Sequence, residues 1–329
     1  MKFGDKNLNI GIMYKREHTP EQLLAFARSV EAAGYDEFWV VEDCFFGSGV
    51  ASAATALAVT DSLTVGLGIM PAVARNPVFS AMEIATLARL FPGRFLPGFG
   101  HGVAEWMEQI GALPASQLKA LGETATVVRR LLRGERVDFA GGEVRVHGAE
   151  LVFPPQQVPP ISLGVRGQKS LRLSGRVADG TILAEFAAPA YVKWARQQIA
   201  QGQAEAGVDG YHRMTVFVMA YLDDVDARAY EPAKALIAAV FSNELIDAQL
   251  EPLGIREQVV ALRERHALEA EMPEAWVRDL VIVGGRDACA EAIQRYIDAG
   301  ADSLVLVPPP EQSLAMPDEI AARLMSFVR

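Results

Sequence analysis

The amino-acid sequence predicts a closed parallel (β/α)8 barrel, the TIM-barrel architecture, formed as one domain over residues 1–329. Short apolar runs alternate with amphipathic stretches of helical length along the chain. Several of these runs are apolar throughout, which is typical of strands in a parallel sheet that helices cover on both faces. An open doubly wound sheet with a second domain is the alternative, but no linker clearly divides the chain.

Eight segments have the composition of buried strands, and stretches of helical length separate them. These strand segments are 8–13, 38–41, 63–69, 94–99, 161–164, 181–184, 214–222 and 303–307. Eight strands that alternate with helices are the number that closes this kind of barrel, so the count favours the closed ring over the open sheet.

Boundary residues support the helices that connect the strands. Thr19 and Pro20 open the first helix and Gly34 follows its end, while Asn76 and Pro77 open a later helix in the same way. The predicted helices are 20–33, 51–59, 77–90, 103–110, 115–132, 170–178, 191–206, 227–241, 256–265 and 287–299.

One insertion interrupts the alternation near the middle of the chain, at about residues 135–160. Residues 135–146 alternate in polarity around Gly141 and Gly142, a pattern that predicts a β-hairpin. The proline-rich segment 153–160 follows and is expected to be an extended connector to the fifth strand.

The charge balance and the cysteines exclude several classes of partner. The 41 acidic residues outnumber the 31 basic ones, so phosphate backbones and anionic membrane surfaces are repelled. Cys44 and Cys289 have no metal-ligand spacing and indicate no disulfide framework, which fits a reducing compartment. Residues 1–14 lack the apolar core of a signal peptide, and 50–65 is too short and polar to span a bilayer. We therefore expect a cytoplasmic protein that binds a small molecule and no nucleic acid, membrane or metal.

The loops that follow the strands build the active site of a (β/α)8 barrel, so reactive side chains are expected at strand ends. Glu42, Asp43 and Cys44 follow the second strand, where two carboxylates beside a thiol suit proton transfer or hydrogen bonding to a substrate. The structural alternative is that Glu42 or Asp43 caps the next helix or pairs with an arginine. In that case Cys44 is only a small buried apolar side chain.

Glycines mark the next two strand ends. Gly68 precedes the β-branched Ile69, and a glycine there allows unusual backbone geometry or the close approach of a ligand. After the fourth strand, His101 lies between two glycines, the second of which is Gly102, and Trp106 follows on a helix. A flat ligand can lie against such a backbone, and His101 can transfer a proton or bind an anion. A plain turn and a packing role for the histidine are the alternatives.

The segment after the fifth strand has the features of a phosphate site. It comprises Gly164, Val165, Arg166, Gly167, Gln168, Lys169 and Ser170 and leads directly into a helix. Its glycines let backbone amides converge, the helix N-terminus favours an anion, and the basic and hydroxyl side chains add charge and hydrogen bonds. The spacing differs from that of a Walker loop, and an ordinary loop with surface basic residues is the alternative. Glu185, after the sixth strand, is a further candidate at the barrel mouth.

In this order, the segments resemble the luciferase-like superfamily of flavin- and deazaflavin-dependent oxidoreductases, including its methylenetetrahydromethanopterin reductase-like members. The resemblance covers nearly the whole chain and rests on residues 34–43, 65–69, 75–77, 92–102, 163–173, 178–180, 283–285 and 300–302. It implies a barrel that binds FMN or the deazaflavin coenzyme F-420 at its mouth, and relatives are often homodimers. It also implies a cis peptide bond between Gly68 and Ile69 beneath the ring system and the cofactor phosphate at 164–170. Gly102, Trp106 and Glu185 are assigned to the same cofactor site.

Two positions depart from the deazaflavin-dependent sugar-phosphate dehydrogenases of the family. Those relatives carry Asp-His where this chain has Asp43-Cys44, and a glutamate where Val103 stands. Their mechanism is therefore in doubt for this chain, and His101 or Glu42 is the alternative carrier of the proton.

The first functional hypothesis is an F-420-dependent reductase or dehydrogenase that transfers hydride to or from a small organic substrate. Asp43, His101, Glu42 and Cys44 are its candidate catalytic residues. An FMN-dependent luciferase-like monooxygenase is the second hypothesis, and a barrel that binds a flavin without turnover is the third.

Overall fold

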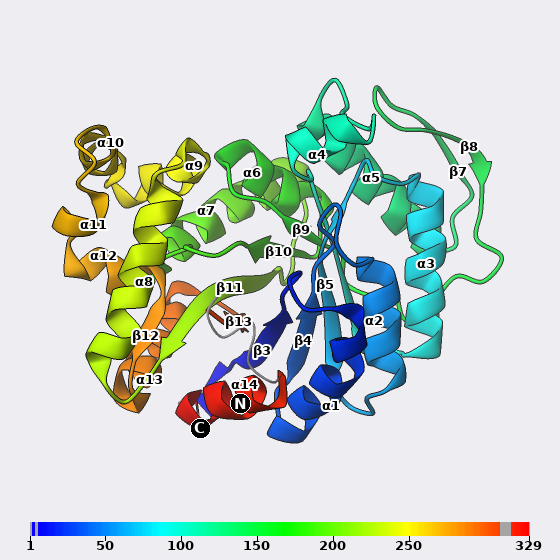
Figure 1. Cartoon of the computed structure of the whole chain (residues 1–329). Helices are drawn as coiled ribbons and strands as arrows, with labels where there is room; N and C mark the ends of the chain where they lie inside the picture. The colour runs from blue at the N-terminus through cyan, green and yellow to red at the C-terminus, as the bar shows by residue number, and fades with distance from the viewer. Residues whose placement is uncertain (1, 4–5, 310–316, 329) are drawn as a thin grey trace.

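The computed structural model describes residues 2–3, 6–309 and 317–328 and contains the expected barrel (Figure 1). Within these residues, eight parallel strands form the ring: β3 (Asn9–Tyr14), β4 (Glu37–Val40), β5 (Thr64–Pro71), β6 (Phe95–Gly100), β9 (Ser162–Gly164), β10 (Gly180–Leu183), β11 (Arg213–Leu222) and β13 (Ser303–Val307). The pairings of β10 with β11 and of β13 with β3 close the ring. All eight predicted strands are confirmed, with bounds that differ by one or two residues.

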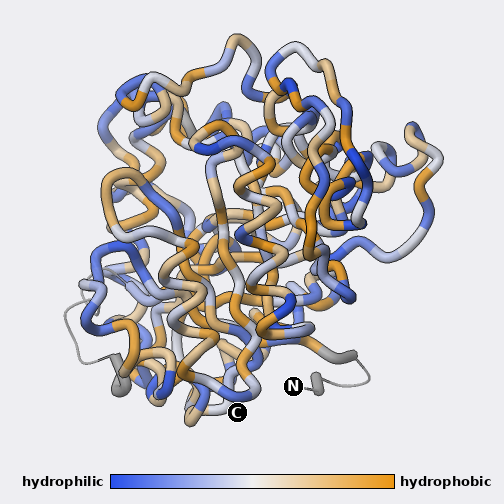
Figure 2. Tube along the Cα trace, turned by 90° about the vertical axis from the view of Figure 1, so that its right-hand side faces the viewer, coloured by the Kyte–Doolittle hydropathy of each residue, from blue (hydrophilic) through white to orange (hydrophobic). Residues whose placement is uncertain are grey.

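The strands are apolar throughout because both of their faces are covered. Every residue of β13 is buried, and nine of the ten residues of β11 are buried. Side chains on one face fill the interior of the ring, and those on the other face pack against helices. Hydrophobic segments accordingly lie in the middle of the molecule and hydrophilic ones toward its outside (Figure 2).

Helices surround the ring on its outer side (Figure 1). Their bounds are η1 (Pro20–Gln22), α1 (Leu23–Ala33), α2 (Gly49–Ala58), α3 (Pro77–Leu90), α4 (Ala104–Gln109), α5 (Gln117–Leu132), α6 (Gln168–Val177), α7 (Pro189–Ala206), α8 (Asp226–Phe241), η2 (Glu244–Ile246), α9 (Asp247–Leu250), η3 (Glu251–Leu253), α10 (Arg256–Glu264), α11 (Leu268–Glu271), α12 (Glu274–Leu280), α13 (Arg286–Ala299) and α14 (Pro317–Val328). Gly34 ends α1 with φ of 82°, and the Asn76 side chain accepts a hydrogen bond from the amide of Val78 at the start of α3. Within the described residues, no helix combines the length and apolar character needed to cross a membrane.

Some elements have no counterpart in the sequence prediction. The three-residue strand β12 (Ile282–Gly284) pairs with the last residues of β11, beyond the part of β11 that belongs to the ring. The short elements between α8 and β12 gather on one side of the barrel (Figure 1), and of these only α10 (Arg256–Glu264) has a predicted counterpart, the helix 256–265. Elements of three or four residues are too short to show a periodic pattern in the sequence. Their conformation depends on the surface that they pack against.

The insertion forms the predicted hairpin, and it projects from the side of the barrel near α3 and α5 (Figure 1). Strands β7 (Val137–Ala140) and β8 (Arg145–Ala149) are antiparallel, and β8 extends slightly farther than the sequence indicates. The Glu123 carboxylate of α5 accepts hydrogen bonds from three consecutive amides of the connecting turn, at 2.8–2.9 Å. This side chain therefore attaches the hairpin to the barrel.

Candidate active site at the carboxyl ends of the strands

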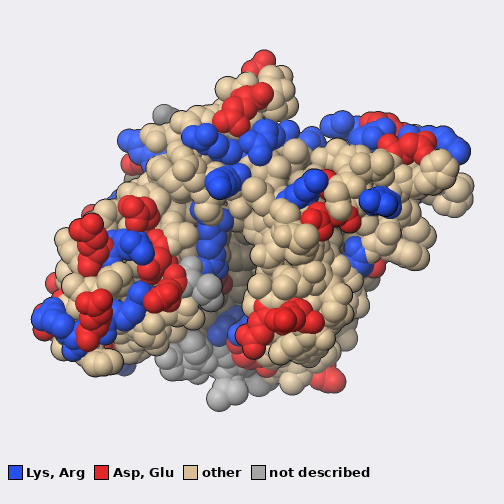
Figure 3. All heavy atoms as spheres, turned by 90° about the horizontal axis from the view of Figure 1, so that it is seen from above, with Lys and Arg blue, Asp and Glu red and all other residues tan. Residues whose placement is uncertain are grey.

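A cavity of about 510 Å³ opens at the carboxyl ends of the barrel strands. The loops after β3, β4, β9 and β10 contribute charged side chains, while β11 and α8 contribute apolar ones. The view from above shows the hollow, with basic side chains along part of its wall (Figure 3). This is the face on which (β/α)8 barrels carry their active sites.

The peptide bond between Gly68 and Ile69 lies at the cavity and is cis, as the family resemblance implies. The pairing of β5 with β6 shifts register between Leu67 and Met70, so both residues lie in an irregular part of the strand. The Ile69 side chain packs against glycines of the neighbouring strands. A Cβ atom on Gly164 would lie only 2.5 Å from Ile69 Cγ2, and one on Gly100 2.7 Å from its Cδ1. The glycines therefore leave room for Ile69 beside the cavity.

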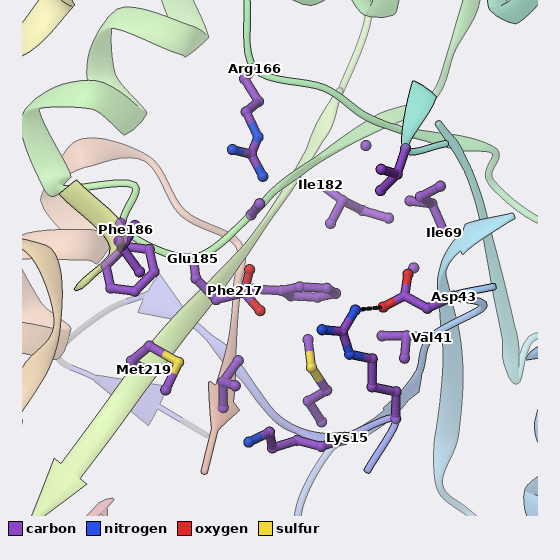
Figure 4. Close-up of a pocket in the computed structure, with 18 of the residues that line it drawn as sticks. Lys15, Val41, Asp43, Ile69, Arg166, Ile182, Glu185, Phe186, Phe217 and Met219 are labelled. Carbon is purple, nitrogen blue, oxygen red and sulfur yellow. Dashed lines mark hydrogen bonds and ion pairs between the residues drawn. The ribbon is translucent and has the colours of Figure 1, made fainter. Parts of the chain in front are cut away.

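Apolar side chains form another wall of the cavity. Phe217 and Met219 of β11 and Ile182 of β10 line the cavity (Figure 4). Leu236 and Val240 of α8 add to this surface. Such a wall excludes water and can hold the flat, largely apolar part of a ligand.

Asp43 is the predicted catalytic residue that the structure places at the cavity. Its Oδ2 accepts a hydrogen bond from Arg16 Nη1 at 2.9 Å, the dashed contact in Figure 4. The Arg16 guanidinium also lies 5.1 Å from the ring centre of Phe46 and 5.8 Å from that of Trp106. Arg16 therefore lies between the Asp43 carboxylate and the Trp106 ring. Both Asp43 and Trp106 are site residues predicted from the sequence.

Glu42 has the structural role that the sequence analysis left open, and it is not among the residues that line the cavity. Its carboxylate forms a two-pronged ion pair with Arg75, with N–O distances of 2.6 and 2.8 Å. Its Oε1 also accepts a hydrogen bond from the amide of Gly49, the first residue of α2. A guanidinium and a helix N-terminus thus occupy the carboxylate, which is the pairing and capping role given as the structural alternative for this position.

Cys44 and His101 also lie outside the lining of the cavity. Cys44 is half-buried beside Asp43 and has a free thiol, and its peptide bond to Phe45 is cis. The two His101 ring nitrogens lie 3.3 Å from the carbonyl oxygen of Gln117 and 3.2 Å from Ser170 Oγ. Burial lowers the pKa of His101, so the ring is neutral at neutral pH. The ring connects the end of β6 with the start of α6 instead of facing the cavity.

Gly102 turns the chain directly after His101. It has φ of 72°, and a Cβ atom there would lie 3.0 Å from both Met107 Sδ and Pro71 Cβ. A glycine is therefore required for the turn, and Gly102 does not itself line the cavity.

The segment 164–170 runs from the cavity to the start of α6. Gly164, Val165 and Arg166 line the cavity, and α6 begins at Gln168. Its N-cap is Gly167, which has no side chain to cap the helix and has open space around its Cα atom. The first amides of α6 are thus free of a capping side chain, and the exposed Lys169 adds positive charge beside them. This donor set fits the phosphate group of a cofactor whose ring system occupies the cavity.

Glu185 lies at the end of β10 and lines the same cavity. Burial raises the pKa of its carboxyl group, which is the direction expected for an acid removed from water without a close cation. A hydrogen bond from the backbone amide of Glu185 itself, Arg166 and Lys15 lower the pKa against this rise, and Asp43 adds to the rise. The cavity therefore holds three carboxyl groups: Asp43 and Glu17 pair with Arg16, and Glu185 has no such partner.

The sequence analysis missed the charged residues after the first strand. Lys15, Arg16 and Glu17 follow β3 and line the cavity. The same strand-end rule that identified Asp43 applies to them, and a run of three charged residues directly after an apolar strand was the available signal. Gln249 was not predicted either, because its position in the short helix α9 becomes relevant only when the fold brings it into contact with Arg166 and Glu185.

Comparisons with known proteins agree with this arrangement. A family model described as luciferase-like monooxygenase matches residues 8–303. The 5,10-methylenetetrahydromethanopterin reductase of Methanolobus tindarius is 27% identical over 311 residues, which cover 92% of this chain and 94% of the relative. An F-420-dependent glucose-6-phosphate dehydrogenase of Microbacterium testaceum is 27% identical over 330 residues, which cover 93% of this chain and 94% of the relative.

A solved structure shows the same fold over the whole chain. The coenzyme F-420-dependent tetrahydromethanopterin reductase of Methanopyrus kandleri matches with a TM-score of 0.80 at 20% identity, and 98% of each chain is covered. The barrel, its order of elements and the match of the family model over most of the sequence lead to one conclusion. The chain belongs to the luciferase-like monooxygenase family.

Proposed function

We propose that this protein is an oxidoreductase that transfers hydride between coenzyme F-420 and a small organic substrate. The observation that carries the proposal is one continuous site, which runs from the cis bond at Ile69 through the cavity to the start of α6. Two of the similar proteins are named as F-420-dependent enzymes, and this supports the choice of cofactor.

The residues present fit such a cofactor. Ile69, Phe217 and Met219 offer an apolar surface for the ring system, while Arg166, Lys169 and the first amides of α6 suit its phosphate. When bound, F-420 supplies a ring carbon that gives or accepts a hydride. The protein's part is to orient the ring and the substrate, to exclude water and to handle the accompanying proton.

Asp43 and Arg16 are suited to orient the substrate. Their ion pair joins the loops after β3 and β4 at the edge of the cavity, and both side chains are partly exposed. A polar group of the substrate can hydrogen-bond to this pair while its apolar part lies against Phe217 and Met219. The side chains at the cavity therefore favour a small organic molecule with one polar, unsaturated group.

The decisive experiment is a titration of the purified apoprotein with F-420 and, separately, with FMN. Replacing Arg166 and Lys169 together by alanine is expected to weaken F-420 binding roughly tenfold or more, because hydrogen bonds to charged groups contribute about 1.5–3 kcal/mol. Fluorescence titration measures both dissociation constants. Arg133→Ala is the control, since Arg133 is an exposed residue directly after α5 and far along the chain from the site.

An unchanged F-420 affinity in the double variant contradicts the phosphate assignment. Tight binding of FMN with no binding of F-420 contradicts the choice of cofactor and favours the second candidate function. That candidate is an FMN-dependent monooxygenase, which the description of the matching family supports.

We also propose that the enzyme is cytoplasmic and forms a homodimer. The free thiols of Cys44 and Cys289 fit a reducing compartment, which cell fractionation can test.

Phe79, Met82 and Leu90 on α3 are 62%, 48% and 65% exposed, and they form an apolar surface that a second copy of the chain can cover. Sedimentation equilibrium is expected to give twice the mass of one chain, and a monomer would contradict the dimer.

A further inference from the structure

Glu185 has a carboxyl group that lines the cavity, and the proposed function gives this group no role. It follows β10 directly and faces the cavity from a different side than Asp43 (Figure 4). Val103, which also lines the cavity, has no proton to give. Glu42 is bound to Arg75, and His101 lies outside the cavity lining. Three acids therefore line the cavity: Asp43 and Glu17 pair with Arg16, and Glu185 does not.

The backbone beside Glu185 is held in an unusual conformation. Phe186 has φ of 66°, in the left-handed region that a bulky side chain rarely adopts. Such conformations persist where the surrounding structure enforces them, and they are concentrated at functional sites. Here the unusual backbone conformation sets the direction in which the chain continues directly after Glu185.

Gln249 of α9 holds this turn from outside. Its side chain is 1% exposed, and its Nε2 donates a hydrogen bond to the Glu185 carbonyl oxygen at 3.1 Å. Its Oε1 accepts a hydrogen bond from Arg166 Nη1 at 3.3 Å. One buried amide therefore connects the turn at Glu185 with the loop that is suited to phosphate.

The charged groups around the cavity leave Glu185 without a close counter-ion. Arg16 pairs with Asp43 and Glu17, and Lys15 Nζ lies 3.8 Å from Glu17 Oε2. A hydrogen bond from its own backbone amide favours the ionised form of Glu185, as do Arg166 and Lys15 from a distance, whereas Asp43 and above all burial disfavour it. Burial raises the pKa of Glu185, so this carboxyl group can stay protonated where an exposed glutamic acid is ionised.

We propose that Glu185 is the general acid that supplies the proton accompanying hydride transfer to the substrate. The proposal rests on the proposed F-420-dependent function, because reduced deazaflavin is the reductant. As the unsaturated carbon of a C=O or C=N group receives the hydride, the electron pair of the double bond moves to the heteroatom. That atom takes the proton of the Glu185 carboxylic acid, which becomes a carboxylate and recovers a proton from water. The substrate gains two electrons and two hydrogens, and the deazaflavin loses the hydride.

The first test measures the protonation state of Glu185 in the full-length apoprotein and needs no cofactor or substrate. Infrared spectra of the wild type at pH 7 are expected to show the C=O stretch of a protonated carboxylic acid. Glu185→Gln is expected to lose that band, and Glu105→Gln, at an exposed position of α4, is expected to keep it. A wild-type spectrum without the band, or a band that Glu185→Gln leaves at full intensity, overturns the proposal, since burial also raises the pKa of Glu83 and that group can contribute to the band.

The second test measures oxidation of reduced F-420 with 2-cyclohexen-1-one as the acceptor. Glu185→Gln is expected to lower the rate at least about a hundredfold, since a positioned general acid contributes roughly 10²–10⁴-fold. The rate is measured at saturating F-420, so that any change in the F-420 affinity of the variant does not enter the comparison. The acid must be protonated to act, so the wild-type rate is expected to fall as the pH rises through the pKa of Glu185. Glu185→Asp is expected to keep this fall, and Glu185→Gln to lose it.

The outcomes separate the two proposals. A wild type that binds no F-420 contradicts the proposed function, while the infrared spectrum still decides whether Glu185 is an acid at pH 7. A wild type that oxidises reduced F-420 while Glu185→Gln keeps both rate and pH profile leaves the proposed function intact. That result overturns the role of Glu185.

Discussion

Replacing Glu37 by alanine is expected to lower the free energy of unfolding by about 3–5 kcal/mol, the loss typical of breaking a buried ion pair. Glu37 begins β4 and is 0% exposed inside the ring. Its carboxylate accepts hydrogen bonds from Asn9 Nδ2, Trp39 Nε1 and Ser303 Oγ, each at 2.8 Å, and pairs with Arg213. Without Glu37, the Arg213 guanidinium is left in the barrel with no counter-ion, and three other donors lose their acceptor.

Urea denaturation followed by tryptophan fluorescence measures this effect. The matched control is Glu205→Ala on α7, whose carboxylate pairs with Arg172 and Arg176 but whose side chain is 45% exposed. An exposed pair contributes at most about 1 kcal/mol, so the control is expected to unfold near the wild-type midpoint. Similar midpoints for the two variants would show that the buried cluster does not stabilise the barrel.

Gly202→Ala is the second substitution with a large expected effect on stability, about 3 kcal/mol or more. Helices α6 and α7 cross with backbone against backbone. A Cβ atom on Gly202 would lie 2.0 Å from the carbonyl oxygen of Arg172, and one on Gly175 2.1 Å from that of Ile199. Backbone atoms cannot move aside as a side chain can, so the helices must separate, and overpacking typically costs about 1–3 kcal/mol and occasionally more. The loss exceeds the roughly 1 kcal/mol that alanine gains over glycine in a helix.

Thermal unfolding of Gly202→Ala and of a control, Gly122→Ala, separates the two contributions. Gly122 is also inside a helix, but its added Cβ would meet the flexible end of Leu173, at 2.9 Å. We expect the control to change stability little. Because α6 starts at the proposed phosphate site, Gly202→Ala is also expected to weaken F-420 binding. Equal melting temperatures in the two variants would argue against a tight crossing.

The barrel was predictable because its signal is repeated and local. Each strand, including β13 with every residue buried, requires an apolar run, and the boundary residues Gly34 and Asn76 act within a few residues of their own positions. The strand β12 escaped prediction because three residues carry no periodicity. It exists only because β11 extends past the ring and offers it a partner.

The candidate site was predictable in part, for a geometric reason. As the rule that loops after strands build the site predicts, Asp43, Gly68 and residues 164–166 line one cavity. The rule does not say which way a side chain turns. Adjacent carboxylates at 42 and 43 differ in role because one meets Arg75 and the start of α2, while the other meets Arg16 at the cavity.

The sequence by itself determined the closed barrel, the face that carries the site and the segment suited to phosphate, since apolar periodicity and glycine-rich strand ends are local properties. Only the tertiary structure decided how differently the acids of the cavity are surrounded. It paired Asp43 with Arg16 and left Glu185 half-buried without a close cation, beside a turn that Gln249 of a distant helix contacts. The environment of a titratable group depends on neighbours from several loops, and those neighbours meet only when the ring closes.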